Sequence, residues 1–130
     1  MFLLNTNAVI AALRGNATLL ARIRNRRPHE IAISSIVAHE LYYGAFKGQR
    51  VEENLAIVDA MQFEMLDFDG DDARCAGEIR AALAVEGQTI GPYDVLIAGQ
   101  ALSRGLILIT RNTREFSRVT ALRLEDWESQ

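Results

Sequence analysis

Two acidic residues stand where a carboxylate could bind a cation. Glu40 lies within or beside the apolar stripe of a predicted helix that ends near Lys47, and a carboxylate there is costly unless it is paired or bound to a cation. Asp94 lies in the first turn of the helix that Pro92 opens, which aims its carboxylate well for a metal ion. Structural interpretations stay open, because Glu40 could reach solvent or an arginine, and the helix dipole favours acids in a first turn.

Polar clusters follow two of the predicted strands. Asn5-Thr6-Asn7 follows the first strand, and residues 110–112 (Thr-Arg-Asn) follow the fourth. Sites in parallel sheets lie beyond the carboxyl ends of the strands, so function is sought there first. Capping is the alternative for both clusters: Thr6 or Asn7 could cap the next helix, and an Asn-x-x-Glu capping pattern begins at Asn112.

Hydrophobic patterning predicts an α/β fold. Strands separated by one or two helices need crossover connections, which gives a three-layer α/β/α domain with a mainly parallel central sheet of about five strands. The predicted strands are Phe2–Leu4, Glu30–Ser34, Phe63–Phe68, Leu106–Ile109 and Leu122–Leu124. The predicted helices cover about 8–13, 17–27, 35–47, 51–61, 71–85, 92–104 and 112–116.

Length and composition predict one globular domain over residues 1–130. Hydrophobic residues make up 49% of the chain and charged residues 24%, which excludes disordered and fibrous classes. The formal net charge of −3 speaks weakly against a nucleic-acid binder. Lys47 is the only lysine among fourteen basic residues, and the arginines could fork onto phosphate oxygens or simply reflect codon bias.

The single cysteine and the lack of a long apolar run predict a cytoplasmic protein. The single Cys75 excludes an intramolecular disulfide and is expected to be a small core residue. His29 and His39 have no partners at ligand spacing, so no structural zinc site is expected. No apolar run approaches the roughly 18 residues that span a membrane, and the start lacks a signal-peptide pattern.

Several catalytic motifs are missing. The sequence contains neither of the glycine-rich phosphate loops nor the G-x-S-x-G nucleophile elbow. An aspartyl-phosphate mechanism, as in some phosphatases, needs an acidic nucleophile after the first strand, and residues 5–7 supply none.

The ordered set of motifs resembles a PIN-domain toxin of the VapC type over essentially the whole chain. Each motif is weak alone, and together they are specific. They are LLNTN at 3–7, AHELYYG at 38–44, GPYD at 91–94 with LIA at 96–98, TRNTREF at 110–116 and LEDW at 124–127.

The resemblance implies a Mg²⁺- or Mn²⁺-dependent endoribonuclease acting on structured RNA, often tRNA. The family's metal-binding and catalytic positions correspond here to Asn5, Glu40 and Asp94, with Asn112 at a fourth position that is acidic in many relatives. One metal ion or two cannot be chosen from sequence. Arginines after the fourth strand could hold flanking phosphates or form a solvated helix face: Arg111, Arg114 and Arg118. A second candidate RNA track, or a solvated helix end, is formed by Arg22, Arg24, Arg26 and Arg27.

The implied partners are an antitoxin of the VapB type, a second toxin chain in a homodimer, and RNA. Operator DNA would be contacted only through the antitoxin, and no membrane is involved. The antitoxin is expected to wrap the toxin and block the acidic pocket.

Asn5 is the one departure from the family pattern, which has Asp at this position. An amide oxygen can touch a cation but carries no charge, so we expect weak metal binding and little or no cleavage. An engineered Asp→Asn change that spares an expression host, or natural degeneration, would explain the departure, and the intact remainder of the site favours the first. The competing functional hypothesis is a non-catalytic PIN-like module that pairs with an antitoxin and helps repress their operon.

Overall fold

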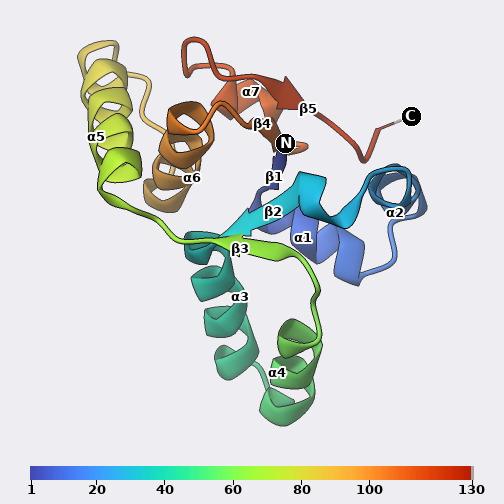
Figure 1. The fold of residues 1–130 in the computed structure, drawn as a ribbon. Helices are drawn as coiled ribbons and strands as arrows, with labels where there is room; N and C mark the ends of the chain where they lie inside the picture. The colour runs from blue at the N-terminus through green and yellow to red at the C-terminus, as the bar shows by residue number, and fades with distance from the viewer. Residues whose placement is uncertain (130) are drawn as a thin grey trace.

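A five-stranded parallel sheet forms the centre of the computed structural model, which describes residues 1–129 (Figure 1). The strand order is β3-β2-β1-β4-β5, and every neighbouring pair is parallel. The chain therefore builds outward from β1 in one direction, then returns past it to build in the other. The strands are β1 (Phe2–Leu4), β2 (Ile31–Ser34), β3 (Glu64–Leu66), β4 (Ile107–Ile109) and β5 (Leu124–Glu125).

Helices cover the sheet on two sides. Figure 1 shows α5 and α6 on one side of the sheet, at the left of the view, and α1 and α2 on the other side, while α3 and α4 extend below it. Opposite faces follow from right-handed crossovers, because the chain steps across the sheet in opposite directions before and after β3. The helices are α1 (Thr6–Leu13), α2 (Ala17–Arg24), α3 (Ser35–Lys47), α4 (Val51–Asp59), α5 (Gly70–Val85), α6 (Pro92–Ser103) and α7 (Thr113–Phe116).

The predicted α/β class and parallel five-stranded sheet are confirmed, with corrections at element ends. The second helix ends at Arg24 rather than Arg27, because the residue before a proline avoids the helical region and Arg27 is extended. Pro28 instead opens a short 3-10 helix that includes Glu30, so β2 begins one residue later than predicted. The third strand is shorter than predicted, and the fifth is shifted toward the C-terminus.

The core lies between the sheet and its helices, and it includes residues close to both chain ends. Trp127 is buried, and its ring packs on Phe2 with a centroid distance of 5.0 Å. The guanidinium of Arg26 lies over the rings of Phe2 and Trp127, at 4.6 and 5.3 Å from their centroids. Arg22 donates hydrogen bonds to the backbone carbonyls of Asp126 and Ser129. Residues 126–129 are thereby held against β1 and α2.

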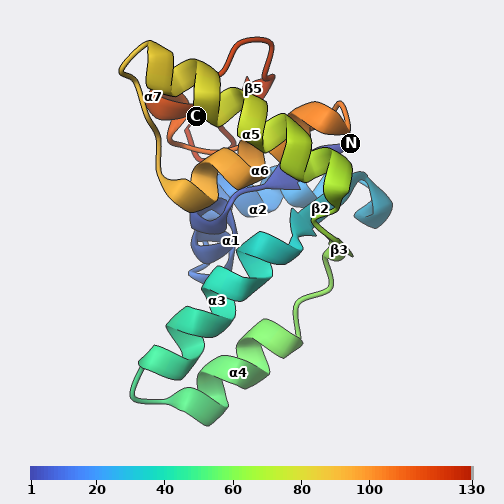
Figure 2. The same cartoon turned by 90° about the vertical axis from the view of Figure 1, so that its left-hand side faces the viewer.

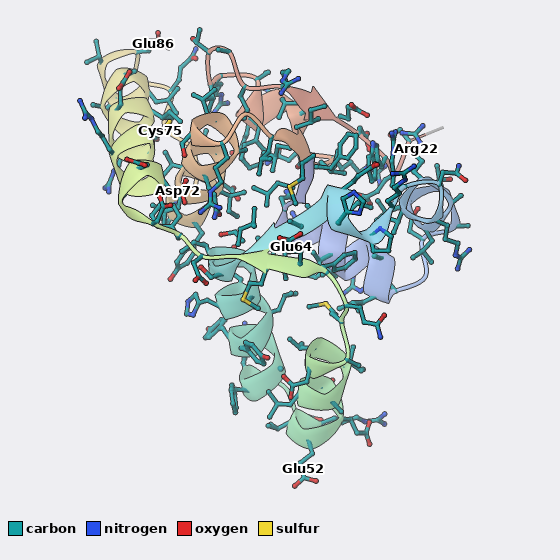
Figure 3. All side chains as sticks on the ribbon, in the orientation of Figure 1. Arg22, Glu52, Glu64, Asp72, Cys75 and Glu86 are labelled. Atoms are coloured by element: carbon teal, nitrogen blue, oxygen red, sulfur yellow. The ribbon has the colours of Figure 1, made fainter. Side chains whose placement is uncertain are left out.

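A buried charge cluster joins the start of α5 to the end of α6 (Figure 3). Asp72 is fully buried, accepts hydrogen bonds from Arg104 and Ser103, and completes a capping box with Asp69. Burial alone would raise the pKa of Asp72, but the hydrogen bonds and the Arg104 charge leave it below its usual value. Cys75, in the same helix, is half-buried against the core rather than a fully buried core residue.

The α3–α4 pair extends away from the rest of the molecule (Figure 2). Ser34 caps α3 by accepting a hydrogen bond from the backbone N–H of Ile36. Large apolar side chains remain exposed on this pair, among them Tyr43, Phe46 and Ile57. Among residues 1–129, no helix is both long enough and apolar enough to cross a membrane.

Candidate active site

The polar residues cluster where the strand order reverses. β1 and β4 are neighbours in the sheet although α1 to α6 separate them in sequence, and this is the position where parallel sheets carry their sites. Asn5 follows β1 directly, and Thr110 follows β4 directly. The side-chain Nδ2 of Asn5 donates to Thr110 Oγ1 at 2.8 Å, so the two strand ends are joined by a buried hydrogen bond.

Asn5 is held in one orientation. Its Oδ1 accepts a hydrogen bond from the backbone N–H of Ala8 at 2.9 Å, which makes Asn5, rather than Thr6 or Asn7, the cap of α1. Only 3% of Asn5 is exposed, and its Nδ2 faces Thr110, whose Oγ1 also accepts from the backbone N–H of Asn112. A donor group therefore stands where an aspartate would place its second anionic oxygen.

Glu40 reaches the same region from α3. Thr6, in the first turn of α1, donates a hydrogen bond from its Oγ1 to Glu40 Oε1 at 2.7 Å. The hydroxyl leaves Glu40 Oε2 without a hydrogen-bond partner within residues 1–129. Glu40 is half-buried, which agrees with its predicted place at the edge of the apolar stripe.

Asp94 shows that the acids converge. It is half-buried in the first turn of α6, and burial, followed by the charges of Glu40 and Glu115, raises its pKa from 3.8 to about 6. Gly91 leaves room for the carboxylate, because a Cβ at this position would lie 3.1 Å from Asp94 Oδ2. Negative charge from α3, α6 and α7 is thus gathered at one place.

Glu115 belongs to this cluster and was missed as a site residue by the sequence analysis. The Asn112-x-x-Glu115 pattern suggested helix capping, but Asn112 makes no side-chain capping bond and instead donates from Nδ2 to Glu115 Oε2 at 2.7 Å. The signal that the sequence offered was Glu115 itself, an acidic residue one turn after Asn112 and shortly after the end of a predicted strand. Spacing alone could not show that it faces Asp94.

No basic side chain neutralises these acids. Within residues 1–129, Glu40, Asp94 and Glu115 form no ion pair, since the ion pairs found involve Arg50 and Arg104. In the same residues, no three His, Cys, Asp or Glu side chains gather closely enough to hold a metal ion by themselves. The acids would therefore need further oxygen ligands, and Mg²⁺ characteristically takes few carboxylates and keeps several waters.

The arginines predicted to hold RNA fall into two groups. Arg118 is half-buried and donates to the carbonyl of Thr89, and Arg22 and Arg26 hold the C-terminal segment, so these three have structural contacts. Arg22 is half-buried, so the expectation of a solvated helix end is wrong for this residue, whereas Arg24, Arg26 and Arg27 are exposed. Arg111 and Arg114 are exposed after β4, close in sequence to Asn112. His29 and His39 are both exposed.

Comparison with known proteins identifies the family to which the chain belongs. A PIN-domain family model matches residues 2–122. The chain is 44% identical over 128 residues to the tRNA(fMet)-specific endonuclease VapC of Shigella flexneri, and 38% identical to ribonuclease VapC2 of Haemophilus influenzae, with 97% of each chain covered. The chain belongs to the VapC group of the PIN-domain family.

Solved structures support the same assignment. The chain superposes with a TM-score of 0.92 on a DNA-bound VapBC complex from Salmonella typhimurium, at 43% identity and 97% coverage of both chains. VapBC2 of Rickettsia felis, bound to a promoter DNA fragment, gives a TM-score of 0.89 at 33% identity, with 97% and 98% of the two chains covered. The predicted family and fold are confirmed.

Proposed function

We propose that this chain is the toxin of a VapBC-type toxin–antitoxin pair and has the active site of a metal-dependent endoribonuclease. The observation that carries the proposal is the convergence of Glu40, Asp94 and Glu115, none of which forms an ion pair within residues 1–129. Burial of Asp94, followed by the charges of Glu40 and Glu115, raises its pKa to about 6. Repelling, partly buried carboxylates are costly, and a divalent cation would relieve that cost.

The ligands for Mg²⁺ or Mn²⁺ would come from Asp94, Glu40 and the residue at position 5, with Asn112 and Glu115 beside them. When bound, such an ion supplies charge neutralisation at the scissile phosphate and an activated water. Thr6 fixes the direction of Glu40 through its hydroxyl, and Asn112 does the same for Glu115 through its amide. These contacts hold the acids in place before any ligand arrives.

The expected substrate is structured RNA, with tRNA(fMet) the first to test. The support is the name of the Shigella flexneri relative, at 44% identity. Arg111 and Arg114, which are exposed and close in sequence to Asn112 and Glu115, would hold flanking phosphates. The expected protein partners are a VapB-type antitoxin, supported by the solved VapBC complexes, and a second copy of the chain.

We further propose that the Asn5 form cuts RNA weakly or not at all. The Nδ2 of Asn5 occupies the position of an anionic oxygen, and its Oδ1 already accepts from Ala8. Asn5→Asp would restore the missing charge without breaking the network. The Thr110 hydroxyl can turn to donate to the new oxygen while it still accepts from the backbone of Asn112.

The test compares the Asn5 chain with Asn5→Asp. We expect the variant to cleave tRNA(fMet) with Mg²⁺ or Mn²⁺ at least about a hundredfold faster, a change of about 3 kcal/mol in the barrier. Mn²⁺ should also raise the melting temperature of Asn5→Asp more than that of the Asn5 chain, because binding stabilises the folded state. Asn5→Asp with Asp94→Asn is the matched control, since it has the new carboxylate but lacks the other.

A folded Asn5→Asp variant that gains neither cleavage of any RNA nor metal-dependent stabilisation would contradict the nuclease proposal. Asn5 itself favours the second candidate, a non-catalytic module that pairs with an antitoxin and contributes to operon repression. That outcome requires antitoxin binding by the Asn5 chain together with inactive Asn5→Asp.

A further inference from the structure

A groove runs between α5 and α6 beside the acidic cluster. It has a volume of about 390 Å³ and is lined by small apolar residues of α5 together with side chains at the start of α6. Ala73, Ala76 and Gly77 form its α5 side, and Pro92 and Tyr93 form its α6 side. Tyr93 immediately precedes Asp94 in the first turn of α6, so one wall of the groove comes from the same helical turn as the carboxylate of the proposed active site.

The Tyr93 ring, which lines the groove, also contacts the ring of His39 on α3. Its ring centroid lies 5.6 Å from that of His39, with 54° between the ring planes. His39 precedes Glu40 on α3, just as Tyr93 precedes Asp94 on α6. Both rings are exposed, Tyr93 to 45%. An exposed aromatic pair therefore joins the two helices that carry the candidate catalytic carboxylates.

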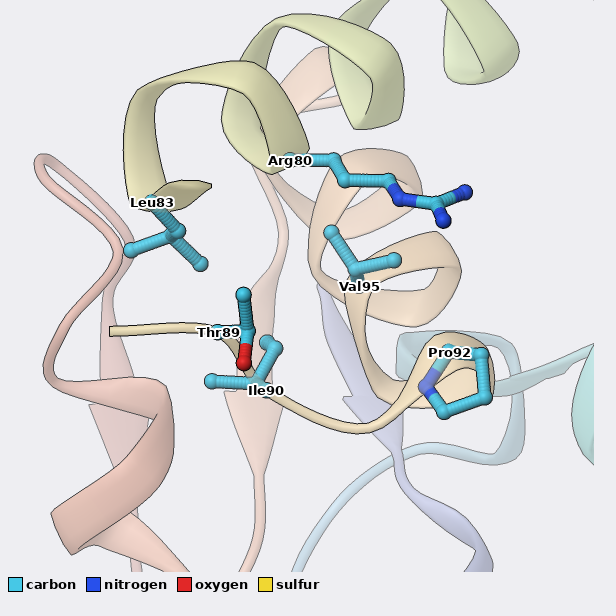
Figure 4. A pocket seen from close by; sticks show the side chains of 6 residues that line it. All are labelled: Arg80, Leu83, Thr89, Ile90, Pro92 and Val95. Carbon is cyan, nitrogen blue, oxygen red and sulfur yellow. The ribbon is translucent and has the colours of Figure 1, made fainter. Parts of the chain in front are cut away.

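Arg80 provides positive charge at the same groove. Its side chain extends from α5 past Val95 to the side of Pro92, and lines both this groove and an adjoining cavity of about 180 Å³ (Figure 4). Arg80 is exposed and forms no side-chain hydrogen bond or ion pair within residues 1–129. Its guanidinium is available for a phosphate, which it could bind through two donors.

We propose that Tyr93, His39, the α5–α6 groove and Arg80 form a binding subsite for one nucleotide of single-stranded RNA. The base stacks on the Tyr93 ring at the groove, and Arg80 binds the adjacent phosphate. Stacking of unpaired bases on aromatic side chains, with basic residues along the backbone, is the usual way proteins bind single-stranded RNA. The inference rests on the proposed ribonuclease function, and it locates the path of the RNA next to the candidate active site.

The groove's size and charge favour RNA over a protein partner. A stable protein interface involves about 20–30 residues and roughly 800 Å² on each partner, whereas this groove of about 390 Å³ has few lining residues, with Arg80 as the basic one. A second copy of the chain is the main alternative occupant, because the groove lies on an exposed helix pair.

The Asn5 chain allows a binding experiment without cleavage. Fluorescence anisotropy would be measured with a labelled single-stranded RNA of about eight nucleotides and mixed sequence. Tyr93→Leu is expected to weaken binding about tenfold, and Tyr93→Phe, which keeps the ring, to leave it nearly unchanged. Tyr43→Leu is the matched control, because Tyr43 is also an exposed tyrosine, at 61% against 45% for Tyr93, and lies one turn beyond His39.

The salt dependence isolates Arg80. Arg80→Gln should reduce the slope of log K against log salt by about 0.7, the value for one phosphate contact on a single strand. Arg74→Gln removes the same charge from an exposed position elsewhere on α5 and should leave the slope unchanged. Tyr93→Leu should lower affinity without changing the slope.

Three results would overturn the subsite. If Tyr93→Leu and Arg80→Gln bind RNA like the parent while Asn5→Asp cleaves RNA, the subsite is wrong and the proposed function stands. If the variants change the oligomeric state by size-exclusion chromatography with light scattering and leave RNA affinity unchanged, the groove is a protein interface. If the chain binds no RNA and Asn5→Asp cleaves none, subsite and function both fail.

Discussion

Asp94 illustrates how much of a residue's chemistry depends on neighbours that sequence does not reveal. Its place in a first helical turn was evident from Pro92, and so was its candidacy as a ligand. Its pKa is raised by burial and by the charges of Glu40 and Glu115. Glu40 is distant in sequence, and Glu115 belongs to a pattern that predicted helix capping. Likewise, Asn5 was identified from sequence as a site residue, but the orientation of its amide depends on Thr110, 105 positions away.

The shifted pKa of Asp94 predicts a pH dependence of stability. The Asp94 carboxyl holds its proton up to about pH 6 in the folded state but releases it near 3.8 in the unfolded chain. The free energy of unfolding of the metal-free protein therefore falls as pH rises from about 3.8 to about 6 and stays lower above that range. Asp94→Asn should therefore be more stable than the parent at pH 7, by about 1–2 kcal/mol after allowing for solvent screening. The difference should vanish as pH falls to about 4.

Urea denaturation in the presence of a chelator measures this difference. Glu52→Gln, an exposed acid on α4 far from the site, is the control and should show no such pH dependence. A stability difference between parent and Asp94→Asn that stays constant from pH 7 to about pH 4 would contradict the shifted pKa.

The positions of the helices in the sequence were largely predictable, whereas the close packing of α5 against α6 was not. Periodicity and the stop at Gly87 and start at Pro92 located α5 and α6 to within a residue or two. Nothing in the pattern indicated that Gly99 meets Ala76, where a Cβ on Gly99 would come within 2.6 Å of the Ala76 Cα. This contact sets the spacing of the two helices, and α6 in turn positions Asp94.

Gly99→Ala should therefore destabilise the protein. The added Cβ would force α5 and α6 apart, at a cost of about 1–3 kcal/mol, despite the higher helix propensity of alanine. Gly77→Ala is the matched control on α5, because a Cβ there meets nothing within 4 Å and should stabilise the helix by about 0.5–1 kcal/mol. Thermal unfolding followed by circular dichroism would measure both, and equal effects of the two changes would refute the packing argument.

The α/β class and the parallel sheet followed from the sequence, because strands separated by helices need crossover connections, whereas the strand order comes from the structure. The continuous apolar run of β4 and the polar clusters after β1 and β4 then placed the site at the reversal of strand order. The role of the arginines did not follow, because a guanidinium can serve RNA, solvent or the chain itself. The structure assigns Arg22 and Arg26 to holding the C-terminal segment against β1 and α2, a contact over about 100 positions.

Arg22 provides the test at this scale. Its guanidinium donates to the carbonyls of Asp126 at 2.7 Å and Ser129 at 3.1 Å, so Arg22→Ala would leave the segment after Trp127 held by fewer contacts. We expect a loss of about 1–3 kcal/mol in unfolding free energy, the range for hydrogen bonds to a charged group. Arg27→Ala, which removes an exposed arginine beyond α2, should change it by less than about 0.5 kcal/mol. RNA binding should be the same in both variants, and a weaker affinity for Arg22→Ala at unchanged stability would return this arginine to the RNA track.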